Sequence, residues 1–133
     1  MVRLVINQDK WIGIGGHFEE GESPEECLER EMLEECNIRP VAPRLRGIIT
    51  FVADDFGCEY MFLYTASQYE GRLASDCPEG DLEWVKKSKV QELPVWSGDH
   101  IFFRLLSENH PFFSLKLYYK GDTLRYAALD GVK

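Results

Sequence analysis

Residues 15–38 of the chain read GGHFEEGESPEECLEREMLEECNI. Between Glu19 and Glu35 this stretch carries nine glutamates and a single basic residue, Arg30. A pair of glycines precedes the acidic residues, and several helix signals lie among them. The stretch therefore predicts a tight glycine turn that leads into an unusually acidic helix.

The predicted helix has clear signals at both ends. Ser23 is a favourable N-cap, Pro24 occupies the first helical position, and Glu26 completes a Ser-x-x-Glu capping box. Asn37 tolerates the left-handed conformation that ends many helices. We therefore expect the helix to run from Ser23 to about Cys36.

Three carboxylates crowd one face of this helix. Glu31, Glu34 and Glu35 stand at positions i, i+3 and i+4, where like charges each cost roughly 0.2–0.5 kcal/mol in an isolated helix. A hard cation such as Mg²⁺, which takes oxygen ligands, would offset this repulsion. Arg30 adds a planar positive group that can orient a neighbouring carboxylate such as Glu22.

These residues carry a resemblance to a known family. With U for an apolar residue, the Nudix box reads G-x5-E-x7-R-E-U-x-E-E-x-G-U. The chain is similar to it at every position but the late glycine, which is Asn37 here. The alternative is a solvated acidic helix face, which would not require Gly16, Glu22 and Arg30 at their places. The matching positions are Gly16, Glu22, Arg30, Glu31, Met32, Glu34, Glu35 and Ile38.

The resemblance implies a fold and a metal site. The fold would be α+β, a mixed β-sheet sandwiched between helices, with the box forming a loop–helix–loop that binds Mg²⁺, or Mn²⁺ as the alternative. Glu31 would be a further metal ligand or the base that deprotonates the attacking water, and Arg30 and Glu22 would hold the carboxylates in place. Glu79 would be a distant acid of the site, or else an exposed turn glutamate. The implied metal ligands are Gly15 through its carbonyl, Glu31, Glu34, Glu35 and Glu79.

A closer resemblance, to the MutT-like 8-oxo-dGTP diphosphatases, extends along nearly the whole chain. It implies that Trp96 stacks on a purine and that Asp99 bonds the edge of the base. Gly16 and Phe51 complete the implied substrate-binding set. Trp96 as a core or loop anchor and Asp99 as a helix cap remain alternatives. The segments that carry the resemblance are 10–16, 47–51, 82–85, 93–99 and 112–118.

The implied activity is Mg²⁺-dependent hydrolysis of a modified purine nucleoside triphosphate to the monophosphate and pyrophosphate. Such an enzyme would remove oxidised nucleotides from the cellular pool. Two alternatives stay open. One keeps the chemistry but acts on ADP-ribose, a dinucleoside polyphosphate or a plain nucleoside triphosphate, and the other is a non-catalytic nucleotide-binding module.

Composition limits the class of protein and its partners. The chain has 133 residues, of which 44% are hydrophobic and 29% charged, and we expect a single domain over 1–133. The formal net charge of −8 argues against nucleic-acid polymers and membranes as partners, but allows a small nucleotide met through a divalent cation. Whether the chain is a monomer or a homodimer stays open. The cysteines show no C-x-x-C pair, which favours reduced thiols in a cytoplasmic protein; they are Cys27, Cys36, Cys58 and Cys77.

The other predicted elements are mostly strands. The first residues, 2–6, supply at most a short strand where the family has a full central one, and we expect a longer form of the chain to be the fully active one. Asp99 lies near the start of a second helix over 98–108. Strands are expected at 11–14, at 45–53 and 58–66 as a hairpin, at 81–86, and at 113–119 and 123–129 as a second hairpin.

Overall fold

The computed structural model describes residues 2–7, 10–13, 16–54, 57–72, 82–85, 89, 92 and 94–133. The chain divides into two compact units, one formed by Met1–Pro43 and Ala66–Val95 and the other by Arg44–Thr65 and Trp96–Lys133. The mixture of helices with a mixed sheet confirms the predicted α+β class. The single domain over 1–133 stays a prediction. Within these described ranges, every helix is too short or too polar to span a bilayer.

The first unit contains a three-stranded antiparallel sheet. Its order is β2-β1-β7, with β1 at Val2–Asn7, β2 at Lys10–Gly13 and β7 at Leu82–Val85. The strands predicted near residues 11–14 and 81–86 are therefore confirmed. β1 is short, as expected, and it is paired along both of its edges.

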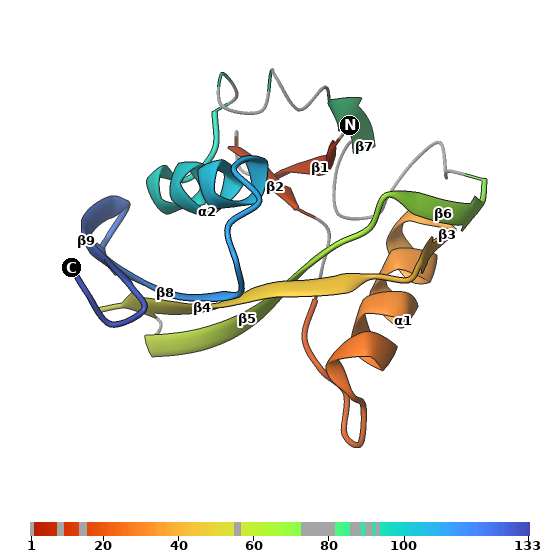
Figure 1. Ribbon diagram of the computed structural model, residues 1–133, viewed down its shortest axis with the longest axis horizontal. Coiled ribbons are helices and arrows are strands. Elements are labelled where there is room, and N and C mark those ends of the chain that lie inside the picture. The colour runs from red at the N-terminus through yellow and green to blue at the C-terminus, as the bar shows by residue number, and fades with distance from the viewer. Residues whose placement is uncertain are drawn as a thin grey trace. The chain divides into compact units, whose positions relative to one another are not determined.

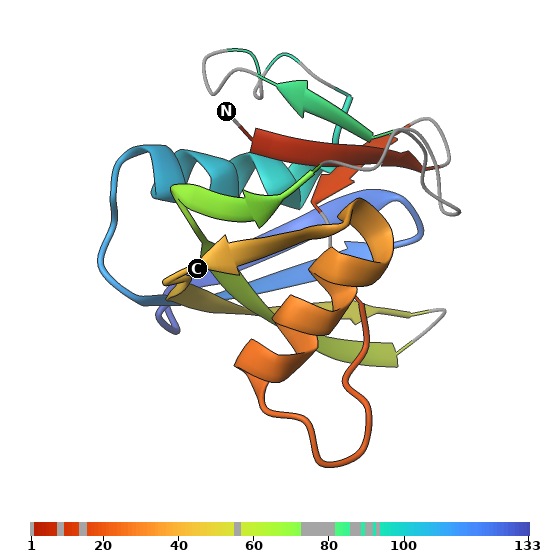
Figure 2. The same ribbon diagram turned by 90° about the vertical axis from the view of Figure 1, so that its right-hand side faces the viewer.

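The acidic helix α1, Pro24–Cys36, also belongs to the first unit and leads into strand β3, Ile38–Val41. β3 pairs antiparallel with β6, Gln68–Gly71, and Figure 2 shows the two strands side by side. The sequence did not predict this two-stranded ribbon. Pro40 lies within β3, and proline lacks the amide donor of a regular strand, so the segment reads as a loop.

The second unit is built on a four-stranded sheet in the order β5-β4-β8-β9 (Figure 1). The two predicted hairpins are confirmed: β4 (Arg44–Ala53) with β5 (Gly57–Thr65), and β8 (Phe113–Lys120) with β9 (Thr123–Leu129). A parallel pairing of β4 with β8 joins them.

The second helix, α2 at Ser97–Ser107, covers one face of this sheet (Figure 1). Phe102 and Leu105 of α2 pack against the inward-pointing side chains of β4 and β8. Burial alternates along β8 with the period of two that places successive side chains on opposite faces. The inward-facing residues of β8 are Phe113, Leu115, Leu117 and Tyr119.

Candidate active site

The local structure of α1 follows the predicted capping signals. The Ser23 hydroxyl accepts a hydrogen bond from the Glu26 amide at 3.1 Å, and the Glu26 carboxylate accepts one from the Ser23 amide at 3.0 Å. At the other end Asn37 is left-handed, with φ 59°, and its amide donates to the Leu33 carbonyl at 3.0 Å. The Asn37 side chain also donates to the Arg72 carbonyl at 3.1 Å. The asparagine therefore serves as the helix C-cap in place of the family's glycine.

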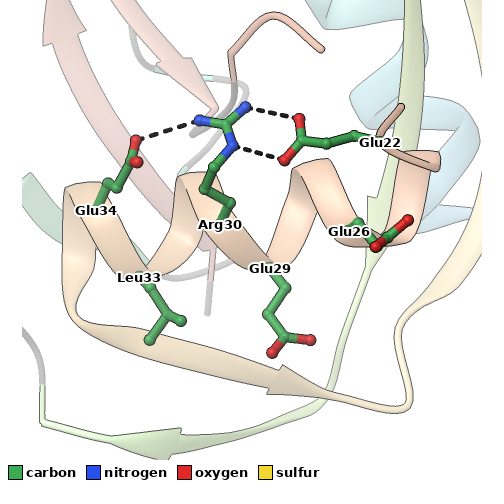
Figure 3. Close-up of a pocket in the computed structure, with 6 residues that line it drawn as sticks. All are labelled: Glu22, Glu26, Glu29, Arg30, Leu33 and Glu34. Atoms are coloured by element: carbon green, nitrogen blue, oxygen red, sulfur yellow. Dashed lines mark hydrogen bonds and ion pairs between the residues drawn. The ribbon is translucent and has the colours of Figure 1, made fainter. Parts of the chain in front are cut away.

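Arg30 is the centre of the side-chain network on α1. Its guanidinium donates two hydrogen bonds to Glu22, Nε to Oε2 at 2.7 Å and Nη2 to Oε1 at 3.0 Å (Figure 3). Its Nη1 donates to Glu31 Oε1 at 2.8 Å and to Glu34 Oε2 at 3.3 Å. The predicted pairing of Arg30 with Glu22 is confirmed, and the same arginine draws two helix carboxylates together.

The loop before α1 is tied to the same arginine through its backbone. Arg30 Nη2 donates to the His17 carbonyl at 3.0 Å, and the Cys27 thiol lies 3.6 Å from that oxygen. The Glu19 amide donates to Glu22 Oε1 at 2.7 Å. Sequence reasoning did not identify His17, Glu19 or Cys27 as site residues. His17 acts through a backbone carbonyl, which carries no sequence signal, while Glu19 acts through its amide and through a carboxylate oxygen 3.6 Å from Arg30 Nη1.

The network shifts the ionisation of its members. The hydrogen bond from Arg30, with a second from the Glu19 amide, holds the pKa of the Glu22 carboxyl below its usual value. The same bond to Glu22 raises the pKa of Arg30 above its usual value. Burial and the nearby Glu22 charge raise the pKa of the Cys27 thiol. The arginine and Glu22 are thus a stable ion pair, and Cys27 is kept as a thiol.

Gly16 lies directly against the Glu31 carboxylate. A methyl group added at Gly16 would overlap the carboxylate of Glu31, so the backbone approaches this side chain as only glycine permits. Glu31 and Glu34 differ in exposure, with side chains 13% and 60% exposed, and Glu35 is buried. The carboxylates on α1 therefore range from solvent-facing to buried, which places them in different electrostatic surroundings.

An open groove of roughly 500 Å³ lies along α1 (Figure 3). In this view Glu29 and Leu33 point away from Arg30, and Glu29 is paired instead with Arg39 Nε at 3.1 Å. The groove is lined by Glu22, Glu26, Glu29, Arg30, Leu33 and Glu34.

The donor set suits a hard cation. Among the described residues, no three His, Cys, Asp or Glu side chains are arranged to hold a metal ion by themselves. Mg²⁺ is usually held by one or two carboxylates, with substrate phosphates and water completing its shell. The helix carboxylates supply oxygen ligands, and the backbone at Gly16 comes close to the Glu31 carboxylate, so both features fit that requirement. The predicted ligands Gly15 and Glu79 lie outside the described residues.

The second unit holds the residues predicted to contact a base. Trp96 occupies the N-cap position of α2 without a side-chain cap, and its half-buried ring meets Tyr119 edge-on at 6.2 Å between centroids. Asp99 lies in the first turn of α2, with its amide bonded to the Trp96 carbonyl at 2.9 Å. Trp96 rather than Asp99 thus occupies the N-cap position, and the role of Asp99 stays a prediction.

Asp99 is a buried carboxyl in an apolar region. It is 6% exposed, and burial raises its pKa to about 7. Gly98 beside it donates its amide to the Tyr119 hydroxyl at 2.8 Å, and a side chain at Gly98 would run into Leu117. The start of α2 is therefore held close to β8. Phe51, on β4, is half-buried and packs against the same hydrophobic core.

The sequence and the structure of this chain are similar to those of known proteins. The NUDIX domain family matches residues 3–106. The chain is 37% identical over 93 residues to the uncharacterized Nudix hydrolase YvcI of Bacillus subtilis, covering 67% of this chain and 59% of that protein. It is 26% identical to the oxidized purine nucleoside triphosphate hydrolase of Danio rerio, over 93% of this chain and 80% of the relative. The crystal structure of the mutator MutT protein from Bacillus halodurans superposes with a TM-score of 0.90 at 33% identity, covering 98% of this chain and 90% of that one.

Proposed function

The chain belongs to the Nudix family, and from this premise we propose that it hydrolyses a purine nucleoside triphosphate to the monophosphate and pyrophosphate. The 8-oxo purine form would be the preferred substrate, and Mg²⁺ would be required. The reaction would add water across the phosphoanhydride bond between the α- and β-phosphates, which gives the monophosphate and pyrophosphate as products.

The observation that carries this proposal is the Arg30 network. One guanidinium fixes Glu22 by two hydrogen bonds and also contacts Glu31 and Glu34. Phosphoryl transfer depends mostly on positioning and on electrostatic stabilisation, so a rigid set of carboxylates is what a metal-assisted hydrolase needs. A protein that only bound nucleotides would have little reason to hold carboxylates together at this cost in repulsion.

Each residue of the network receives a proposed role. Glu34, Glu35 and the Gly15 carbonyl would hold Mg²⁺. Glu79 would be a further donor from a distant part of the sequence. The metal, when bound, polarises phosphate oxygens and lowers the pKa of a bound water. Glu31 would add a ligand or take the proton of the attacking water. Arg30 and Glu22 would keep these carboxylates in position, and Gly16 would let phosphate oxygens approach the backbone.

The preference for an oxidised purine rests on the start of α2. Trp96 offers a flat ring that can cover a base, and Asp99 offers a carboxyl that can bond the edge of a guanine. The printed name of the Danio rerio relative, an oxidized purine nucleoside triphosphate hydrolase, favours the same substrate class. Phe51 would be a further residue in contact with the base.

A substrate panel tests the proposal. The purified chain is incubated with Mg²⁺ and 8-oxo-dGTP, dGTP, ADP-ribose or a dinucleoside tetraphosphate, and the products are separated by chromatography. The expected result is preferential release of pyrophosphate from 8-oxo-dGTP, abolished by a chelator. Activity on ADP-ribose or the tetraphosphate alone would reject the substrate and keep the chemistry. Activity on none of them would favour a nucleotide-binding module.

Substitution of Asp99 separates base recognition from metal chemistry. Asp99→Ala should raise KM for 8-oxo-dGTP by about tenfold or more, since a buried hydrogen bond to a polar substrate group is lost. The Mg²⁺ concentration that gives half-maximal activity should not change. An equal loss on every substrate of the panel would instead assign Asp99 a structural role in α2.

A further inference from the structure

The face of the second unit's sheet that points away from α2 carries its own groove. Because burial alternates along β8, Ser114, Lys116 and Tyr118 lie on the opposite face from the core residues of that strand. The groove has a volume of roughly 360 Å³. Its lining includes Thr50, Ser114, Lys116, Tyr126 and Lys133.

Both charged side chains lining this groove are lysines, although the whole chain has a formal net charge of −8. The Nζ atoms of Lys116 and Lys133 lie 5.5 Å and 4.1 Å from the centroid of the Tyr126 ring. The ring holds both cations in one place by cation–π attraction. The interaction with Tyr126 raises the pKa of Lys116 above its usual value, so the amine stays protonated.

Two carboxylates of this unit, Asp54 and Asp130, accept hydrogen bonds from groups other than the lysines. Asp54 accepts from the Tyr118 hydroxyl at 2.7 Å, and Asp130 accepts from the Ser114 amide at 2.9 Å. Neither forms an ion pair with Lys116 or Lys133 in the described part of the chain. The two ammonium groups therefore have donor capacity to offer to a ligand.

The aromatic ring in the groove is not a platform for a nucleobase. Tyr118 stacks on Tyr126 with ring centroids 5.4 Å apart and planes 17° apart, and the two ammonium groups also lie over the Tyr126 ring. Little of the ring is left for a base. What the groove offers instead is two cations with hydroxyl groups from Thr50 and Ser114 beside them. This donor set matches an oxyanion with several acceptor oxygens.

We propose that this groove, named here the Lys116–Lys133 groove, is a binding site for a phosphate-class oxyanion. It would take inorganic phosphate, pyrophosphate or the phosphate group of a nucleotide through Lys116, Lys133 and the two hydroxyls. The site needs no metal ion, in contrast to the glutamate site of the first unit. The proposal does not depend on the hydrolase activity.

Titration with inorganic phosphate and pyrophosphate in excess EDTA tests the site, since the chelator removes any binding mediated by a metal at the glutamates. Binding is measured by calorimetry at low ionic strength and located by the amide NMR shifts of Ser114, Tyr126 and Gly131. We expect saturable binding with a dissociation constant on the order of millimolar. The double substitution Lys116→Gln with Lys133→Gln should weaken it by roughly tenfold or more, because two charged donors are lost.

Two single substitutions complete the test, the first of them as a matched control. Lys120→Gln, on the same strand but outside the groove lining, should bind phosphate as the unaltered chain does. Lys133→Gln alone, at an exposed position, should weaken binding without disturbing the fold. Absence of saturable binding, or equal binding by the double variant, would overturn the proposal.

A third titrant distinguishes a free anion from a nucleotide. Guanosine monophosphate should bind about as tightly as inorganic phosphate, since the site contacts the oxyanion alone. Binding that is tenfold tighter than that of phosphate, with new shifts in the Tyr118 and Tyr126 rings, would overturn the proposal in favour of a nucleotide site.

Discussion

The pKa of a carboxyl group shifts in opposite directions in the two units: downward beside Arg30 in the first unit and upward at Asp99 in the second. Around Arg30, charged groups compensate one another, and the pKa of Glu22 is held below its usual value. At Asp99, burial raises the pKa of the carboxyl to about 7. The first arrangement keeps the Glu22 carboxylate ionised, while burial at Asp99 favours the protonated carboxyl, which can donate as well as accept a hydrogen bond.

Under the proposed function, the two kinds of carboxyl site would meet different requirements of a nucleotide substrate. The phosphates need fixed negative ligands for a cation, which local helix spacing can supply. A base edge needs a desolvated polar group, which only tertiary packing can supply. Substitutions at the two places should therefore fail in different ways.

The largest effect is expected from Glu35→Gln. If the Arg30 region is a metal site, loss of this buried carboxylate should lower kcat by about a thousandfold, since metal-assisted charge stabilisation contributes several kcal/mol. The measurement is kcat against Mg²⁺ concentration. Glu29→Gln is the matched control, because Glu29 lies on the same helix but pairs with Arg39, and it should retain full activity. Full activity of Glu35→Gln would remove Glu35 from the metal ligands.

Gly16→Ala should come next. The new methyl group overlaps the Glu31 carboxylate, and a displacement of about 1 Å can cost a hundredfold in rate. We expect kcat to fall by about that factor while the free energy of unfolding changes little. Steady-state kinetics together with urea denaturation separate these effects. A variant as active as the unaltered chain would show that the contact between Gly16 and Glu31 has no part in catalysis.

Arg30→Lys tests whether the geometry of the network matters or only its charge. Lysine keeps the charge but cannot make the paired hydrogen bonds to Glu22, so activity should fall by about 10–100-fold, as for other residues that orient metal ligands. The apparent affinity for Mg²⁺ should fall as well. Retention of activity within a factor of two would mean that a point charge is sufficient.

Asp99→Asn tests the burial of the Asp99 carboxyl through the stability of the protein. Because the pKa of Asp99 in the folded state lies above its usual value, the folded protein binds its proton more tightly than the unfolded chain does. Stability is therefore full below about pH 4 and is lost as the pH rises to about 7, the folded pKa. The neutral asparagine lacks this loss, so the variant should gain about 1–3 kcal/mol relative to the unaltered chain between pH 5 and pH 8. Chemical denaturation at pH 5 and at pH 8 measures the free energy of unfolding of both proteins. If the difference between them does not change with pH, the burial of an ionisable group at this position is contradicted.

The smallest effect is expected from Ser23→Ala. The capping box is complete at this position, and its loss should lower the free energy of unfolding by about 1 kcal/mol. Because the Ser23 hydroxyl bonds to the Glu26 amide and not to a residue held by Arg30, its removal should change kcat less than twofold. A loss of activity comparable with that of Arg30→Lys would show that the start of α1 itself positions the carboxylates.

How far the sequence predicts the molecule depends on how local each feature is. The capping box, the Asn37 cap and the Arg30–Glu22 pair involve residues close in the chain, and all three were predicted correctly. The ribbon of β3 and β6 was not predicted, for two reasons. Pro40 is atypical of a strand, and β6 lies about thirty residues further along the chain than β3.

The environment of Asp99 could not be predicted from its neighbours in the sequence. The start of α2 approaches Leu117 and Tyr119, which follow it by about twenty residues and belong to β8. A period-two pattern predicts that β8 buries one face, but not which helix covers that face. The same limit applies to the Lys116–Lys133 groove, whose lining comes from three strands and the end of the chain.

The parallel pairing of β4 with β8 has a consequence for the order in which the chain folds. Gly47 lies opposite Phe113, so the two strands are 113 − 47 = 66 residues apart, and a segment between them belongs to the other unit. The other unit is also discontinuous, since β1 pairs with β7. Neither unit can be completed until most of the chain has left the ribosome. We therefore expect the two local hairpins to form early and the β4–β8 pairing to limit the folding rate, because closing so long a loop costs entropy before any contact is gained.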